Sequence, residues 1–298
     1  MRFGIDLGGT KIEIIALDDT GKERYRQRVN TPQGNYQQTL QAIVDLIASA
    51  RQAVAPAEYT VGIGIPGAMS LKTGRVKNAN SVWLIGEPLK DDLQQRLGQE
   101  VRINNDANCL TVSEATDGAA AGAPVVFGVI IGTGTGGGIA VNRQVITGVN
   151  AIAGEWGHNP MPWKDNTEAP VQCYCGKQDC IETFLSGPGM LKRFIARGGQ
   201  ADSPAAIVEQ ADTGSELAEA FMQDYELWLA NGLAGVINIL DPDVIVLGGG
   251  LSNIERLYQN VPPLWQHGVF SDQVSTRLVK ARYGDSSGVR GAAWLWPL

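Results

Sequence analysis

The chain has 298 residues, of which 44% are hydrophobic and 18% charged, a balance typical of a soluble globular protein with a sizeable core. Its formal net charge of −7 argues against a nucleic-acid partner, which would need a basic face. No apolar run reaches the roughly 18 residues of a membrane span. The first residues also lack a basic segment followed by an apolar stretch, so we expect a cytoplasmic protein with no membrane partner.

The first half of the chain predicts a β-meander with a glycine turn, followed by a helix. Apolar strands at 2–7 and 12–17 flank the turn Gly8-Gly9-Thr10, and a third strand is expected at 23–29. Apolar residues three and four positions apart predict a helix over 36–54. Further elements of this half are strands at 61–65 and 101–103 and a helix over about 107–121. The mixture of strands and helices indicates an α/β fold.

The second half repeats the order of the first. A strand at 125–131 ends in the glycine-rich turn 132–138, and strands at 139–141 and 144–147 follow. The later elements are a long helix over 216–240, a strand at 244–247, a third glycine turn at 248–250 and a short helix over 288–296. This order predicts a structural duplication of two related halves.

Each of the three glycine turns ends an apolar strand, as a phosphate-binding turn does. Such a turn directs backbone N–H groups at an anion without side chains in the way. The spacing of Gly132, Gly134 and Gly137 also matches the dinucleotide-binding fingerprint, which must open a helix. The residues after Gly137 instead predict a strand, and no G-x-x-x-x-G-K-[ST] motif is present. We therefore expect phosphate binding outside the Rossmann and P-loop classes.

These motifs resemble those of the actin, heat-shock ATPase and hexokinase superfamily. The segment Asp6-Leu7-Gly8-Gly9-Thr10-Lys11 is similar to its first phosphate motif, Gly132 to Gly138 to its second, and Leu247-Gly248-Gly249-Gly250 to its adenosine motif. Within the superfamily, the chain resembles the ROK family of bacterial sugar kinases and repressors from Gly4 to the tail at 291–293.

The resemblance implies a two-lobed actin-like ATPase fold built from two ribonuclease-H-like halves that close on ATP and a sugar. The expected small lobe is 1–117 with 287–298, and the expected large lobe is 118–286, which carries a zinc-binding loop. The resemblance also implies a homodimer.

The same resemblance assigns the ATP and Mg²⁺ ligands. Asp6 would hold Mg²⁺, through water, because magnesium keeps much of its hydration. The residues expected to bind the nucleotide and its metal are Asp6, Gly8, Gly9, Thr10, Lys11, Gly132, Thr133, Gly134, Gly248, Gly249 and Gly250.

Asp106 is the candidate catalytic base. It lies between a predicted strand and a predicted helix, where the helix N-terminus would keep its carboxylate ionised and able to take a hydroxyl proton. A plain helix N-cap is the structural alternative, since Asn and Asp both suit that position. The segment Asn105-Asp106-Ala107-Asn108 resembles the ROK catalytic segment, in which the aspartate is the base.

Three cysteines and one histidine predict a zinc site. Cys173, Cys175 and Cys180 lie within eight residues, and His158 is one of two histidines in the chain. Zinc prefers four tetrahedral thiolate or imidazole ligands. The alternative is a group of reduced buried cysteines beside a core histidine, and Cys109 is expected to be a buried helix residue outside the cluster.

The cluster also matches the ROK pattern E-x-G-H followed by C-x-C-G-x-x-G-C-x-E, except that Asp179 replaces its second glycine. Aspartate tolerates left-handed backbone geometry, so the turn can still form. The zinc is expected to be structural: it would hold the loop that carries Glu182, and the second ring nitrogen of His158 would reach a sugar hydroxyl.

The resemblance places a hexose among planar polar groups. The expected sugar ligands are Gly67, Asn80, Asn105, Asp106, Glu155, His158 and Glu182. Segments 77–84, 155–160 and 284–290 look closest to the bacterial ROK fructokinases, also called mannokinases, whereas N-acetylglucosamine kinases of the family differ around Trp83. We therefore expect phosphorylation of D-fructose at its 6-hydroxyl, with a glucokinase or an N-acetylglucosamine or N-acetylmannosamine kinase as the alternative.

The alternatives without enzymatic activity are a transcriptional repressor of the ROK family and a sugar-sensing regulator. ROK repressors carry a helix-turn-helix before the first phosphate motif, whereas here the first strand is predicted from Arg2. A sugar-sensing regulator is possible, although it would not need Asp106.

Overall fold

The computed structural model describes residues 1–79, 81–164 and 169–296. The chain divides into two compact units, the first formed by Met1–Gly122, Gly138–Ala153 and Arg282–Leu298, and the second by Ala123–Gly137 and Gly154–Ala281. The lobes expected from the sequence stay a prediction, and they differ from these units mainly in the place of the segment 138–153.

The first five-stranded sheet has the strand order β3-β2-β1-β4-β7. Its strands are β1 (Arg2–Leu7), β2 (Lys11–Leu17), β3 (Glu23–Asn30), β4 (Thr60–Ile65) and β7 (Val101–Asn105). β1 pairs with β2 antiparallel and with β4 parallel. The first glycine turn therefore leaves the sheet at the carboxyl end of β1, its central strand.

The second five-stranded sheet repeats this arrangement with the order β10-β9-β8-β11-β12. Its strands are β8 (Val125–Ile131), β9 (Thr135–Val141), β10 (Gln144–Val145), β11 (Val244–Gly248) and β12 (Arg277–Lys280). β11 pairs parallel with both β8 and β12, as β4 does with β1 and β7. The predicted duplication of two related α/β halves is confirmed by this matching strand order.

Helices follow the strands in the same order in both halves. They are α1 (Tyr36–Val54), α2 (Leu89–Leu97), α3 (Asp106–Thr116), α4 (Glu182–Leu185), α5 (Gly187–Ala196), α6 (Pro204–Asp212), α7 (Glu216–Leu240), α8 (Arg256–Trp265) and α9 (Ser287–Trp294). The minor elements are the two-stranded sheet of β5 (Ala68–Met69) and β6 (Val76–Lys77), and the short 3-10 helices η1 (Val82–Leu84), η2 (Trp156–His158), η3 (Gly250–Asn253), η4 (Gln266–Gly268) and η5 (Gly284–Ser286).

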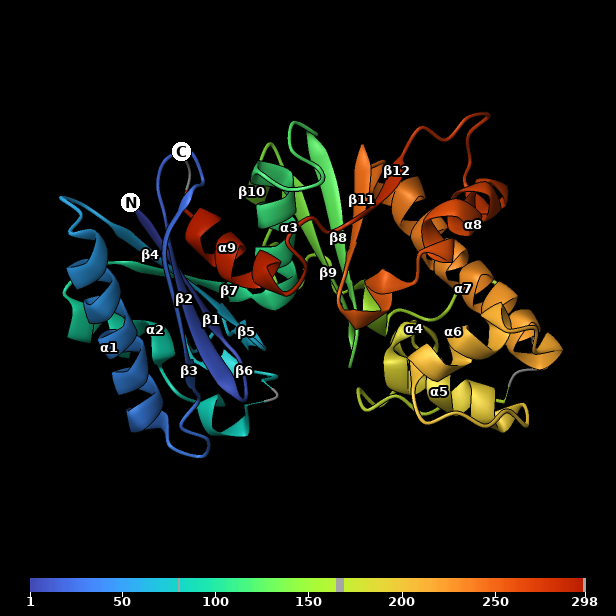
Figure 1. The fold of residues 1–298 in the computed structure, drawn as a ribbon, viewed down its shortest axis with the longest axis horizontal. Helices are drawn as coiled ribbons and strands as arrows, with labels where there is room; N and C mark the ends of the chain where they lie inside the picture. Colours follow the sequence, from blue (N-terminus) through green and yellow to red (C-terminus); the bar gives the residue numbers. More distant parts are fainter. Residues whose placement is uncertain (80, 165–168, 297–298) are drawn as a thin grey trace. The chain divides into compact units, whose positions relative to one another are not determined.

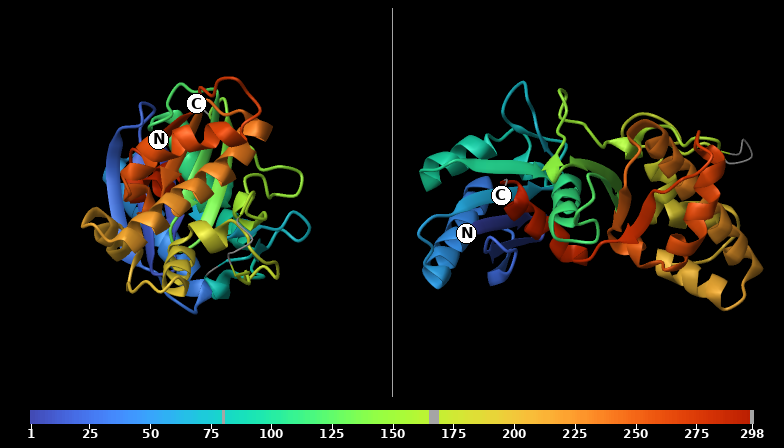
Figure 2. Two further views of the ribbon diagram at one scale, coloured as in Figure 1. Left: turned by 90° about the vertical axis from the view of Figure 1, so that its right-hand side faces the viewer. Right: turned by 90° about the horizontal axis from the view of Figure 1, so that it is seen from above.

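The C-terminal helix α9 packs on the first sheet, as the red helix beside the blue strands in Figures 1 and 2 shows. Glycines permit this close approach. A Cβ at Gly4 would lie 2.1 Å from the carbonyl oxygen of Val289, and a Cβ at Gly62 would lie 1.8 Å from that of Ala292. The end of the chain therefore completes the core of the first unit.

The predicted strands and helices are found close to their expected positions, with two kinds of difference. The helix expected to extend to about residue 121 ends at Thr116, because turns follow it and Glu114 accepts a hydrogen bond from the N–H of Ala119. The sequence patterns do not predict the helices α2, α4, α5, α6 and α8 or the strands β5, β6 and β12. Helix α8 contains Pro262 and Pro263, which normally indicate the end of a helix. Within the described ranges, no helix combines the length and the apolar character needed to cross a bilayer.

Candidate active site

The first glycine turn joins β1 to β2, and the segment after β3 holds its carbonyl groups. Thr31 Oγ1 donates to the carbonyl oxygen of Gly8 at 2.8 Å, and Gln33 Nε2 donates to that of Gly9 at 2.9 Å. A Cβ at Gly8 would lie 2.9 Å from the carbonyl oxygen of Lys11, so the turn requires glycine there. The N–H of Gly8 donates to the carbonyl oxygen of Lys11 at 2.9 Å within the turn, so the N–H groups of Gly9 and Thr10 are the ones that the turn could present to an anion. The sequence patterns do not predict these roles of Thr31 and Gln33. Their position directly after β3, the strand paired with β2, could have indicated that they lie near the turn that precedes β2.

Asp6 is the last polar residue of β1 before this turn, and its carboxyl group is buried. Burial, followed by the charges of Asp106 and Glu13, raises the pKa of Asp6 to about 7, against a smaller lowering by Arg28. A nearby cation would reverse this penalty, since it favours the ionised carboxylate. The chemistry of Asp6 therefore fits its predicted role near Mg²⁺.

Asp106 is the first residue of α3, and its neighbour takes the capping role. The side chain of Asn105 accepts a hydrogen bond from the N–H of Asn108 at 2.8 Å, which makes Asn105 the N-cap. Asp106 Oδ1 accepts from the N–H of Ala107 at 2.8 Å. The structural alternative in which Asp106 is the N-cap is therefore wrong. The predicted base instead lies in the first turn of α3, where the helix N-terminus favours its ionised form.

Gly67 packs against the segment that was expected to contact the sugar. A Cβ at Gly67 would lie 2.9 Å from Ala79 and from the carbonyl oxygen of Lys77, so a larger residue would displace this segment. The predicted ligand Asn80 lies outside the described residues. The next residue, Ser81, is 1% exposed, and its Oγ lies 3.4 Å from the Cβ position of Gly9 in the first glycine turn. Among the described residues its buried hydroxyl has no hydrogen-bond partner.

The second and third glycine turns lie side by side in the second unit. A Cβ at Gly132 would be 3.8 Å from the backbone nitrogen of Gly250. Gly249 adopts a φ of 82°, and a Cβ there would lie 2.5 Å from the carbonyl oxygen of Ile131. Glycine is therefore required at position 249 by both its backbone conformation and its packing. The two turns that were assigned to phosphate and adenosine are thus brought together.

The predicted sugar ligands of the second unit differ in their contacts. Glu182, the first residue of α4, accepts a hydrogen bond from the N–H of Thr135 through Oε2 at 2.9 Å. Glu155 is exposed and is the N-cap residue that precedes the 3-10 helix η2. The side chains predicted to assist the phosphates, Thr10, Lys11 and Thr133, are also exposed. Their roles stay predictions.

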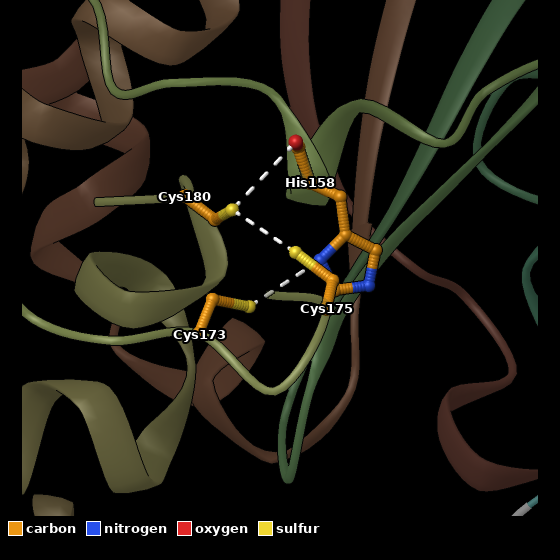
Figure 3. Close-up of side chains that lie close together, drawn as sticks. All are labelled: His158, Cys173, Cys175 and Cys180. Carbon is orange, nitrogen blue, oxygen red and sulfur yellow. Dashed lines mark hydrogen bonds between the residues drawn. The ribbon is translucent and has the colours of Figure 1, made fainter. Parts of the chain in front are cut away.

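The four predicted zinc ligands converge, as Figure 3 shows. The ligand atoms of His158, Cys173, Cys175 and Cys180 all lie within 4.8 Å of one another. Tetrahedral ligands about 2.3 Å from a zinc ion would lie about 3.8 Å apart. Burial raises the pKa of Cys180 to about 12, so a thiolate there needs a cation beside it. Geometry and chemistry therefore fit zinc.

The surroundings of this cluster agree with one expectation and differ from another. Asp179 has a φ of 53°, the left-handed geometry expected for the residue that replaces glycine, and its carboxylate pairs with Lys164 and Arg193. Nδ1 of His158 faces Cys173 Sγ at 3.6 Å. Nε2, which was expected to reach a sugar hydroxyl, lies 3.0 Å from the hydroxyl of Tyr174 in this structure.

Comparison with known proteins places this arrangement in a family. A relative from Pasteurella multocida (strain Pm70), named N-acetyl-D-glucosamine kinase, is 39% identical over 302 residues and is matched over 99% of both chains. The crystal structure of a ROK hexokinase from Thermus thermophilus has a TM-score of 0.87 and 26% identity, with 99% of this chain and 97% of that chain covered.

A ROK family glucokinase from Streptomyces griseus, solved with glucose and AMPPNP, has a TM-score of 0.75 and 27% identity, with 98% of this chain and 97% of that chain covered. These similarities confirm the actin-like ATPase fold expected from the glycine turns. The ROK family model itself matches residues 2–298, so the chain belongs to the ROK family.

Proposed function

We propose that the chain is an ATP-dependent sugar kinase that transfers the γ-phosphoryl group of ATP to the 6-hydroxyl of a free hexose. The observation that carries the proposal is the position of Asp106. Asn105 supplies the cap of α3, and Asp106 follows in the first helical turn, where a helix N-terminus favours a negatively charged side chain. A carboxylate held in this way can orient a hydroxyl group and accept its proton.

The other residues have roles that match the needs of phosphoryl transfer, which are positioning and charge neutralisation. The glycine turns at 8–10 and 132–134 are proposed to bind the phosphates, and the turn at 248–250 the adenosine. Asp6 is proposed to hold Mg²⁺, which neutralises phosphate charge when it is bound. As the bond from the sugar oxygen to phosphorus forms and ADP leaves, Asp106 takes the hydroxyl proton.

Two hexoses are candidates for the acceptor. D-Fructose is supported by the resemblance of segments 77–84, 155–160 and 284–290 to ROK fructokinases. N-acetyl-D-glucosamine is supported by the name of the Pasteurella multocida relative, which is similar over the whole chain, and the comparisons favour this second candidate. Overall identity of 39% places the chain in a class of enzymes, but acceptor choice depends on a few groups around the sugar.

A coupled assay of ADP release tests the proposal with fructose, N-acetylglucosamine, glucose, mannose and N-acetylmannosamine as acceptors. The favoured hexose should show the highest kcat/KM, and phosphorus NMR of the product should show a 6-phosphate. Asp106→Asn should lower kcat by about 10²–10⁴, because a positioned base is lost. Asp91→Asn, which changes an exposed acid in the first turn of α2, is the matched control and should keep full activity.

The outcomes distinguish an enzyme from a non-enzymatic sugar sensor. Near-normal turnover of Asp106→Asn would show that Asp106 is not the catalytic base. Binding of nucleotide and sugar without ADP release from any acceptor would favour the non-enzymatic sugar-sensing regulator instead. We further propose that the chain works in the cytoplasm as a homodimer with a structural zinc ion on His158, Cys173, Cys175 and Cys180, as its resemblance to the family implies.

A further inference from the structure

The carboxylate of Glu182 contacts the second glycine turn directly. Its Oε2 accepts the hydrogen bond from the N–H of Thr135 at 2.9 Å. A Cβ at Gly134 would lie 2.8 Å from the same oxygen, which is closer than a methyl group can approach without displacing the carboxylate. Residue 134 is therefore glycine in part because the side chain of Glu182 occupies the adjoining space.

The same turn is braced at two further points from neighbouring segments of the second unit. A Cβ at Gly157 would lie 2.0 Å from the carbonyl oxygen of Thr135, so the backbone of the Glu155–His158 segment packs tightly on that peptide group. At the start of α5, the N–H of Gly187 donates to the carbonyl oxygen of Gly132 at 2.7 Å. The glycine turn is thus positioned by the segments that carry the proposed hexose and zinc ligands, and Glu182 supplies the side-chain part of that support.

Glu182 can serve the turn and a sugar at the same time. Only Oε2 is used by Thr135, and among the described residues no hydrogen bond reaches Oε1. An ionised carboxylate accepts several hydrogen bonds, so a sugar hydroxyl on Oε1 need not displace the N–H on Oε2. A hydrogen bond to a charged acceptor is also stronger than one between neutral groups.

We propose that Glu182 is a positioning residue for the nucleotide-binding turn 132–134 in addition to a ligand of the hexose. The inference rests on the proposed function, which assigns the sugar to Glu182 and the phosphates to this turn. A hexose that immobilises the carboxylate also orders the peptide bonded to it, so nucleotide binds more tightly to the hexose-loaded protein. Because coupling between two ligands is reciprocal, nucleotide raises the affinity for hexose by the same factor.

The test is a calorimetric titration of Mg·ADP into the full chain with no sugar present. Glu182→Ala should weaken nucleotide binding about tenfold or more, since the loss of a charged acceptor leaves the N–H of Thr135 unpaired. Glu182→Gln keeps an oxygen acceptor for this N–H and should bind nucleotide within about threefold of the unchanged protein. Glu216→Ala removes an exposed carboxylate from the first turn of α7, which is not part of the proposed sugar or nucleotide site, and should leave sugar-free nucleotide binding unchanged.

A second variant distinguishes a direct effect of Glu182 on the turn from a general folding defect. Gly134→Ala should weaken Mg·ADP binding in the unchanged protein but much less in the Glu182→Ala background, because the side chain that the new methyl group displaces is already gone. The inference is overturned if Glu182→Ala binds nucleotide as the unchanged protein does, if Glu182→Gln is weakened as much as Glu182→Ala, or if the Gly134→Ala effect is the same in both backgrounds.

The coupling itself is measured by repeating the titration at saturating D-fructose and at saturating N-acetyl-D-glucosamine. One of the two sugars should tighten Mg·ADP binding by about fivefold or more in the unchanged protein and by less than twofold in Glu182→Ala. No tightening with a sugar that the enzyme demonstrably phosphorylates would overturn the coupling. If no hexose is phosphorylated at all, the proposed function fails, whereas the sugar-free titrations still decide the role of Glu182 at the turn.

Discussion

At the scale of single residues, ionisation of Asp6 lowers the free energy of unfolding of the protein in a pH-dependent way. Its carboxyl group is buried beside Asp106 and Glu13, and its pKa is raised to about 7 from the ordinary value near 3.8. Below about pH 4 this carboxyl group is protonated in both the folded and the unfolded protein, so it does not change the free energy of unfolding. As the pH rises from about 4 through about 7, the unfolded state ionises more readily than the folded state, and the free energy of unfolding falls.

Asp6→Asn should therefore stabilise the protein at pH 8, by at most about 4 kcal/mol, in the absence of nucleotide and Mg²⁺. At pH 4 the gain should nearly vanish, because the carboxyl group is then protonated in both states. Urea unfolding of both proteins at the two pH values measures this difference. An equal gain at pH 4 and pH 8 would show that ionisation of Asp6 does not lower the free energy of unfolding.

The residues of the site differ in how far the sequence could predict them. Glycine turns at strand ends are local patterns, so residues 8–10, 132–134 and 248–250 could be found without a structure. The support of the first turn by Thr31 and Gln33 could not, because it depends on the pairing of β3 with β2. The capping role of Asn105 likewise depends on where α3 begins, and pattern reasoning leaves a helix start uncertain by a residue or more.

At the scale of elements, glycines decide how closely α9 and α3 pack. A Cβ at Gly291 in α9 would lie 1.6 Å from the carbonyl oxygen of Cys109 in α3, so these helices touch backbone to backbone. Glu114 of α3 strengthens the connection, because its buried carboxylate accepts hydrogen bonds from the N–H of Arg282 at 3.0 Å and the hydroxyl of Ser287 at 2.8 Å. The contact that holds α9 is therefore built from small residues and one buried acid.

Gly291→Ala should destabilise the protein by about 3 kcal/mol or more, because the added methyl group has no room and the backbone must move. Gly235→Ala is the matched control within helix α7, where the new Cβ would have nothing within 4 Å. It should stabilise the protein by about 0.5–1 kcal/mol through the higher helix propensity of alanine. Urea unfolding of the two variants compares them. A similar small effect at both positions would contradict the packing described for α9.

The cysteine cluster joins η2 to the loop before α4, and its metal should be measurable directly. Protein purified from zinc-supplemented culture should contain about one zinc ion per chain by mass spectrometry, and Cys175→Ser should contain far less. Cys109→Ala is the control, since this buried cysteine lies outside the cluster, and it should keep its zinc. Chelation should also lower the melting temperature of the unchanged protein. Full zinc in Cys175→Ser would rule out the four-ligand site.

At the scale of the whole molecule, the duplication could be predicted because each half begins with the same local pattern of strand, glycine turn and strand. The matching strand orders β3-β2-β1-β4-β7 and β10-β9-β8-β11-β12 follow from it. Other parts depend on tertiary packing that no local pattern contains. Helix α8 is one case, because Pro262 and Pro263 within it oppose a helix and burial of Leu257, Val261 and Trp265 outweighs that preference.

The packing of α9 on β1 and β4 has a consequence for synthesis of the chain. A ribosome releases β1 and β4 more than 200 residues before it releases the helix at Ser287–Trp294 that covers Gly4 and Gly62. Until then the apolar side chains that pack against Val289 and Ala293 of α9, among them Ile15, Leu17 and Val112, lack this cover. Contacts between such distant segments form slowly. Chaperone capture of stalled chains that end before residue 287 would be the cellular sign of this late closure.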